Sequence, residues 1–195
     1  MGGLVLWVLG YPAQAMERMH EALTPARELA HPPMLANILY WVAWLHQCRR
    51  EGPLARERAE ACITLATEHG LAAMGALGTQ VRGWALTVQG HGEEGIAPLR
   101  QGIAAWRAAG SAVGRTNHLA MLAEAYGNVG QPVEGLNTIA EALAFVHTTG
   151  ERCYEAELYR LKGESLLSCH PAFPAVPQEC FHLYSFSISC QTTCC

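Results

Sequence analysis

The sequence predicts an all-α fold, a right-handed superhelical solenoid of antiparallel helix pairs with a 40-residue period. The first observation behind this prediction is a register of turn residues spaced by one period: Gly10, Arg50, Gly90 and Gly130. The second is that the apolar residues between these turns follow helical spacing. A fixed period of about 20 to 50 residues is typical of solenoids, in which each unit buries its apolar face only against its neighbours.

Three further registers repeat at the same period. One lies half a period from the first and marks a second turn in each unit: Ala30, Gly70, Gly110 and Gly150. The other two place small residues inside helices: Ala43, Gly83, Ala123 and Gly163 in first helices, and Ala15, Ala55, Gly95 and Gly135 in second helices. Paired helices approach closely only where side chains are small, so we expect these positions at the contacts between the two helices of each unit.

The first unit is truncated, because the turn at Gly10 follows a segment long enough for only half a helix. We therefore expect this chain to be a fragment of a longer protein. The opening MGGLVLWVLG has no basic region and no cleavage site, so it is not predicted to be a secretory signal. It is also too short to span a bilayer. These features predict a cytoplasmic protein.

The second, third and fourth units each read as two helices joined by a turn. The fourth shows the pattern most clearly, because Leu119, Leu122 and Ala123 share one helical face before the turn at Gly130. Pro132 then opens the next helix, where its missing N–H costs nothing. The second helix of this unit carries an apolar face of Gly135, Ile139, Ala142, Leu143 and Val146.

The helical pattern fails after Leu167, and we divide the chain into a repeat domain, residues 1–168, and a tail, residues 169–195. Three prolines in the tail, Pro171, Pro174 and Pro177, are incompatible with a continuous helix. We expect this Cys-rich tail to be irregular, disordered or out of frame. The last helix of the repeat domain would then lack its cover, so self-association through the C-terminal end is expected.

Composition excludes some classes of function. The 195 residues carry a net charge of −4, which provides no general attraction for nucleic acid, and the only basic cluster is the pair Arg49 and Arg50. No spacing typical of a nucleophile with its base, or of a cofactor-binding loop, is present. The sequence therefore predicts a non-enzyme with no cofactor, no catalytic residue and no membrane or nucleic-acid partner.

Cysteines and histidines offer an alternative. Several soft metal ligands crowd the tail: Cys169, His170, Cys180, His182, Cys190, Cys194 and Cys195. The chain has no CxxC pair, and the spacing of these residues does not match a zinc site, so no metal ligand is predicted. A small metal-binding or catalytic protein that uses this cluster remains the alternative reading. In the repeats we expect Cys48, Cys62 and Cys153 in the core, and the single histidines at the surface or at helix ends.

The repeat positions resemble those of the tetratricopeptide repeat. Its pattern of large, large, small, aromatic, glycine, small, aromatic and small residues is matched in the fourth unit by Leu119, Leu122, Ala123, Tyr126, Gly130, Gly135, Ile139 and Ala142. The segments LAEAYGNVGQPVEGL and RGWALTVQGHGEEGIAPLRQGIAAWRAAG look more closely like the long-helix repeats that follow the ATPase core in large bacterial signalling proteins, some with a nucleotide cyclase domain. This resemblance implies an interaction or regulatory module of such a protein. An effector region of a transcription regulator is a further alternative.

The resemblance also implies a binding surface on the first helices of the units, which would line the concave side. The residues expected there are Asn37, Tyr40, Trp44, Gln47, Gln80, Trp84, Asn117, Glu124 and Arg160. Tryptophan supplies a large contact area and amides pair with peptide backbone, so this surface predicts a protein or peptide partner, or other domains of the parent chain. The opposing interpretation is that Trp44 and Trp84 fill the seams between units.

Overall fold

The computed structural model describes residues 2–169, and these residues form helices joined by short turns. The helices are α1 (Gly2–Val8), α2 (Pro12–Glu28), α3 (Pro32–Cys48), α4 (Gly52–Glu68), α5 (Ala72–Val88), α6 (Gly92–Ala108), α7 (Arg115–Asn128), α8 (Pro132–Thr149) and α9 (Glu155–Cys169). The predicted all-α helical repeat is confirmed. The predicted tail, residue 169 excepted, lies outside the described residues.

Left-handed residues end the helices at a spacing of 20 residues, as the two turn registers predict. Positive φ angles occur at Gly10, Ala30, Arg50, Gly70, Gly90, Gly110, Gly130 and Gly150. After α3 the Glu51 N–H donates to the His46 carbonyl at 2.9 Å and the Arg50 N–H to the Gln47 carbonyl at 3.0 Å, the pair of bonds of a Schellman motif. These helices therefore end at local left-handed turns, which the register of turn residues predicted.

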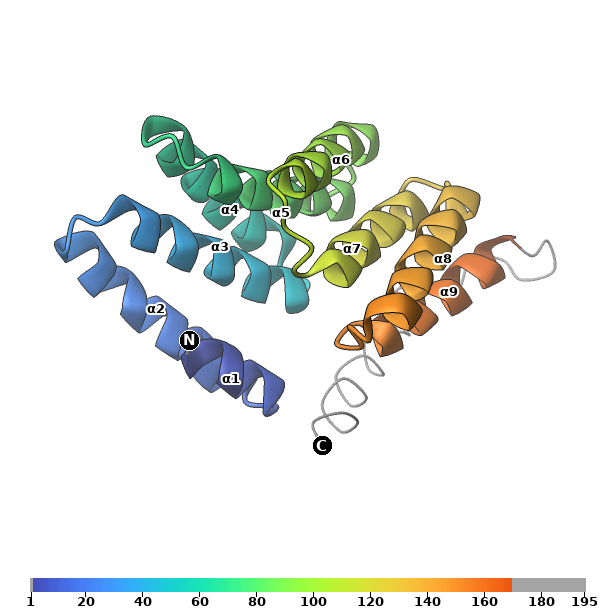
Figure 1. Ribbon diagram of the computed structural model, residues 1–195, viewed down its shortest axis with the longest axis horizontal. Coiled ribbons are helices and arrows are strands. Elements are labelled where there is room, and N and C mark those ends of the chain that lie inside the picture. Colours follow the sequence, from blue (N-terminus) through green and yellow to red (C-terminus); the bar gives the residue numbers. More distant parts are fainter. Residues whose placement is uncertain (1, 170–195) are drawn as a thin grey trace. The chain divides into compact units, whose positions relative to one another are not determined.

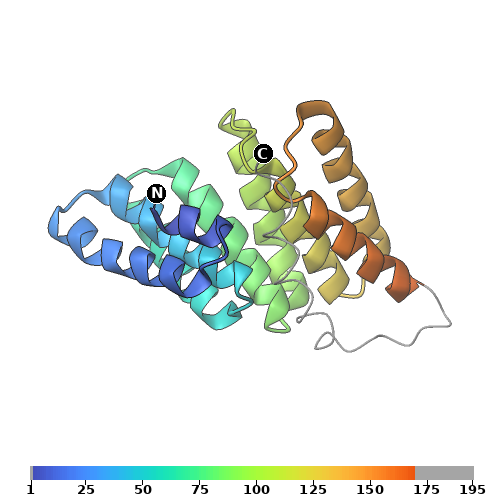
Figure 2. The same cartoon turned by 90° about the horizontal axis from the view of Figure 1, so that it is seen from below.

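The chain forms two compact units, one up to Ser111 and one from Ala112 onward. In unit 1, α3 lies between α2 and α4, and it also contacts α5 (Figure 1). In unit 2, α8 lies beside both α7 and α9, and α7 contacts α9 (Figure 2). Within unit 1, α3 and α5 touch each other and α4 packs against both, and within unit 2, α7 and α9 touch each other and α8 packs against both.

The predicted close contact between paired helices is confirmed at Gly83. A Cβ atom on Gly83 would lie 2.6 Å from the Gly95 carbonyl oxygen and 2.7 Å from the Leu99 amide nitrogen. Ala123 is buried at the same register, and a Cβ on Gly135 would lie 3.2 Å from the Ala123 carbonyl oxygen. At Gly163 an added Cβ would have no described atom within 4 Å, and the second helix of that unit would fall beyond residue 169, outside the described residues.

The core of unit 2 confirms the apolar faces predicted for its helices. One cluster of buried residues joins α7, α8 and α9: Leu119, Ala120, Ala123, Ile139, Ala142, Val146, Leu158 and Leu161. These positions follow the helical spacing of the sequence, so burial of the face stabilises the helices that present it. Among the described residues no helix has both the length and the apolar character that a membrane span requires.

Candidate interaction surface

Most residues of the predicted binding surface are buried, which corrects the expectation that they are accessible. The buried members are Tyr40, Trp44, Gln47, Gln80, Trp84 and Asn117. Trp84 is 0% exposed and Trp44 is 9% exposed, so these indoles fill the interior, as the opposing interpretation held. Asn37 is exposed, and Glu124 and Arg160 are partly buried.

The physical reason is the number of neighbours around an odd-numbered helix. α5 contacts α3, α4 and α6, which leaves little of its circumference for solvent. Gln80 shows the consequence, because its side-chain Nε2 donates to the Gly102 carbonyl at 3.1 Å. The sequence analysis expected the Gln80 amide to bind the backbone of a peptide partner. It instead forms a hydrogen bond with a backbone carbonyl of its own unit.

An aromatic cluster on α1 and α3 keeps part of its surface accessible. It comprises Trp7, Tyr40, Trp41 and Trp44. The Trp44 ring packs edge-to-face against Trp7, with centroids 6.2 Å apart, and against Trp41, with centroids 5.6 Å apart. Trp7 and Trp41 are partly exposed. Edge-to-face geometry is favourable for aromatic pairs, so buried Trp44 holds both indoles in fixed orientations.

Sequence reasoning missed Trp7 and Trp41 as surface residues. Trp41 directly follows Tyr40, and Trp7 lies in the truncated first unit, so neither fell at a position that the repeat resemblance marks as concave. The available signal was the density of aromatic residues, since Tyr40, Trp41 and Trp44 stand within one and a half helical turns. Such density in the middle of a helix indicated a cluster without indicating which members would stay exposed.

Arg160 is already paired within its own helix. Its Nη2 and Nε lie 2.6 Å and 2.8 Å from the two carboxylate oxygens of Glu157, and its Nη1 also bonds Glu164. Burial alone would lower the pKa of Arg160, but the bonds to Glu157 and Glu164 outweigh it and raise the pKa above its ordinary value. A partner would have to compete with this bidentate pair, so Arg160 is a weaker candidate than the aromatic cluster.

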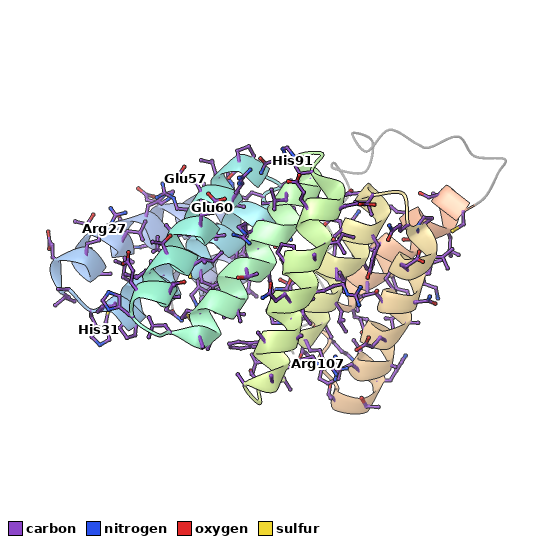
Figure 3. All side chains as sticks on the ribbon, turned by 90° about the horizontal axis from the view of Figure 1, so that it is seen from above. Arg27, His31, Glu57, Glu60, His91 and Arg107 are labelled. Atoms are coloured by element: carbon purple, nitrogen blue, oxygen red, sulfur yellow. The ribbon has the colours of Figure 1, made fainter. Side chains whose placement is uncertain are left out.

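The outer surface of unit 1 carries charged side chains on α4 and α6. Figure 3 shows Glu57 and Glu60 projecting from α4 and Arg107 from the end of α6. Glu60 forms an ion pair with Arg56 at 2.8 Å, one helical turn away. Exposed pairs of this kind contribute at most about 1 kcal/mol to stability. This charged face is therefore an ordinary solvent-exposed helix surface.

Two of the histidines expected at the surface or at helix ends lie near helix ends, as expected, but their side chains are buried. His46 lies in the last turn of α3, where its Nδ1 is 2.6 Å from Glu51 Oε2. Burial alone would raise the pKa of Glu51, but the bonds from His46 and Arg49 outweigh it and lower that pKa. His46 therefore braces the turn between α3 and α4. His118 in α7 is the second buried histidine.

Burial of His118 makes unit 2 sensitive to acid. His118 is 4% exposed, and desolvation lowers its pKa to about 4, below the ordinary 6.5. The imidazole of His118 therefore takes up a proton near pH 6.5 in the unfolded chain, but only near pH 4 in the folded unit. We expect the free energy of unfolding to fall by up to about 1.4 kcal/mol per pH unit below about pH 6.5, with the loss complete near pH 4.

Urea unfolding at pH 7 and pH 5 measures this effect. His118→Gln should remove most of the pH dependence, whereas the matched change His147→Gln, at an exposed position of the same unit, should leave it unchanged. An equal loss of stability on acidification in wild type and His118→Gln would contradict the assignment.

The described cysteines form no disulfide and differ in burial. Cys62 is buried in α4, where its thiol donates to the Ala36 carbonyl at 3.4 Å. Burial raises the pKa of Cys62 to about 12, so the thiol stays protonated and behaves as a small core residue, as predicted. Cys48 is only partly buried and Cys153 is exposed, which corrects the expectation of core positions for both.

Among residues 2–169 no group of three or more His, Cys, Asp or Glu side chains is arranged to hold a metal ion. Of the Cys/His cluster in the tail, only Cys169 is described, and it is exposed at the end of α9. The rest of that cluster lies outside the described residues, so the metal-binding alternative keeps its place as a prediction about the tail.

Comparison with solved structures identifies a similar fold. A crystal structure from Podosopora anserina, described as a kinesin light chain with nearly identical TPR-like repeats, matches this chain with a TM-score of 0.55 and 16% sequence identity. The match covers 85% of this chain and 86% of that one. This likeness defines the class of fold, a TPR-like helical repeat. No family model matches the sequence, and no curated protein is significantly similar to it.

Proposed function

We propose that this chain is a non-catalytic protein-interaction module, a segment of a larger cytoplasmic signalling protein of the ATPase or cyclase type. The observation that carries the interaction role is the pair of partly exposed indoles, Trp7 and Trp41, oriented by buried Trp44. The TPR-like fold supports it, because helical repeats present extended surfaces for recognition. The parent context rests on the sequence resemblance alone.

The chemistry of the aromatic cluster favours a protein or peptide partner. Tryptophan is enriched at interaction hot spots because it buries a large area and has only two side-chain torsions to fix. Trp41 already packs edge-to-face against buried Trp44, which restricts its side chain and presents a partner with a more preorganised contact. Exposed Asn37 lies one helical turn before Trp41 and offers amide hydrogen bonds to a peptide backbone.

A peptide selection tests the proposal without knowledge of the natural partner. Peptides from a displayed random library would be selected on the wild-type chain and their affinities measured by calorimetry. We expect Trp41→Ala to weaken these peptides at least about tenfold, or about 1.4 kcal/mol, because it removes a preorganised hot spot. Trp106→Ala, at a partly buried tryptophan on α6, is the matched control and should change their affinity little.

The two variants must be compared at equal folded fraction, which circular dichroism reports. Selected peptides that bind both variants as tightly as the wild type would remove the aromatic cluster from the proposal. A selection that enriches no peptide at all would count against the interaction role itself.

A further inference from the structure

The helical hairpin formed by α1 and α2 holds α3 at two ring contacts. Trp7 of α1 packs edge-to-face on Trp44 of α3, with centroids 6.2 Å apart. The imidazole of His20 in α2 lies beside that of His46 in α3, with centroids 5.9 Å apart. Trp44 and His46 are two residues apart, so their side chains leave α3 in directions about 200° apart. The hairpin therefore grips α3 from two nearly opposite sides, once through an indole and once through a titratable ring.

Movement of α2 would be passed on to Trp7, because α1 packs on α2 and α2 packs on α3 (Figure 1). The two helices of the hairpin are in close contact. A Cβ on Gly3 would lie 2.8 Å from Met19 Cγ and 3.0 Å from the Ala15 carbonyl oxygen. We therefore expect α1 to follow α2, so the contact between His20 and His46 also helps to hold Trp7 against Trp44.

The carboxylate of Glu51 is already bonded on both of its oxygens. One oxygen lies 2.6 Å from Nδ1 of His46, and the other lies 2.8 Å from Nη2 of Arg49. The side chain of His46 is buried, so this arrangement fixes its ring beside His20. A proton on His20 would therefore gain little from Glu51, whose charge is shared between two nearer donors.

The other groups around His20 are mostly cationic. Three titratable or charged groups act on it across the contact: His46 of α3, Arg58 of α4 and Glu51 of the turn between them. Helix α1, with the sequence GGLVLWV, has no titratable side chain. On α2 itself Glu17 lies one turn earlier and is exposed, so solvent screens its charge.

The balance of these effects disfavours a proton on His20 while the hairpin is docked. Desolvation lowers the pKa of His20 below the ordinary 6.5, and His46 and Arg58 lower it further, whereas Glu51 raises it without cancelling the decrease. A hairpin released from α3 would restore the ordinary pKa and so bind the proton more tightly. Docking is therefore undisturbed above about pH 6.5 and weakens as the pH falls below that value.

We propose that the hairpin of α1 and α2 is a proton-sensitive clamp, which holds Trp7 in the aromatic cluster near neutral pH and loosens its grip on α3 in mild acid. The clamp would regulate the interaction surface, so its biological meaning rests on the proposed function. His20 is exposed, so the proton reaches it without unfolding of unit 1. This response is separate from that of His118, which lies in unit 2.

Hydrogen exchange of the full chain, corrected for the intrinsic effect of pH on exchange, measures the opening of the clamp. A single proton changes the docking equilibrium at most about tenfold per pH unit, and solvent screening at exposed His20 reduces this. We expect the protection of α2 to fall about threefold between about pH 7 and about pH 5.5, a change below that ceiling. The protection of α6, which has no histidine, should stay constant.

Two variants identify the sensor. His20→Gln should abolish the loss of protection in α2, whereas His69→Gln, at an exposed position in the same unit, should leave it as in the wild type. The ring protons of His20 should titrate in NMR spectra with a midpoint below 6.5. A midpoint at or above 6.5, or an equal loss of protection in wild type and His20→Gln, overturns the proposal.

A bound peptide tests the link to the aromatic cluster. A peptide selected on the wild type and free of His, Asp and Glu should bind the docked hairpin preferentially, and so restore the protection of α2 at about pH 5.5. A bound peptide that leaves α2 as open as before overturns regulation of this surface. If no peptide is selected, the proposed function fails, but exchange and the His20 titration still decide whether the clamp exists.

Discussion

Gly83→Leu is expected to destabilise unit 1 by about 3 kcal/mol or more. Overpacking a core typically costs about 1 to 3 kcal/mol, because neighbouring side chains must shift. Here the first added atom would already lie 2.6 Å and 2.7 Å from backbone atoms of α6, which cannot rotate away as a side chain can. The substitution therefore forces α5 and α6 apart along their whole contact. Calorimetric or urea-induced unfolding of the purified chain measures the loss.

Gly127→Leu provides the control for this experiment. Gly127 lies within α7, and no described atom lies within 4 Å of an added Cβ, so leucine there should be neutral or should stabilise the helix by up to about 1 kcal/mol through its better helix propensity. Equal melting temperatures for Gly83→Leu and the wild type would show that α5 and α6 do not approach as described.

Trp84→Ala is expected to cost about 3 to 5 kcal/mol of stability, the range measured for large aromatic residues removed from protein cores. Trp84 is fully buried, so its replacement leaves a cavity that the packed helices around it can close only in part. The sequence analysis placed Trp84 on the predicted binding surface, with packing between units as the opposing interpretation. Trp41→Ala, at a partly exposed position on α3, should lower the melting temperature much less.

Measured together, these two variants separate packing from recognition. Unfolding curves should rank Trp84→Ala as far less stable than Trp41→Ala, whereas peptide affinity at equal folded fraction should show the reverse order. A Trp84→Ala chain with nearly wild-type stability would be inconsistent with a fully buried indole.

The sequence by itself determined the helices and their ends. The residues that stop each helix act locally: Gly90 and Gly130 adopt the left-handed conformation at little steric cost, and Pro132 starts a helix where no N–H is needed. Ala30 and Arg50 adopt the left-handed conformation although they are not glycines, and only the 20-residue spacing predicted turns at these two positions. The close helix contact at Gly83 was also predictable, because a small residue recurs at that position every 40 residues.

The tertiary structure alone decided which polar and aromatic side chains reach solvent. Helical spacing identifies an apolar face, but it cannot say how many neighbours surround a helix. Because three helices contact α5, its residues Gln80 and Trp84 lie in the interior. His46 and His118 are also buried. In α9 the same register led to the opposite result, since Gly163 has no described helix across it. Burial depends on what packs around a helix as well as on its own sequence, and that information is not local.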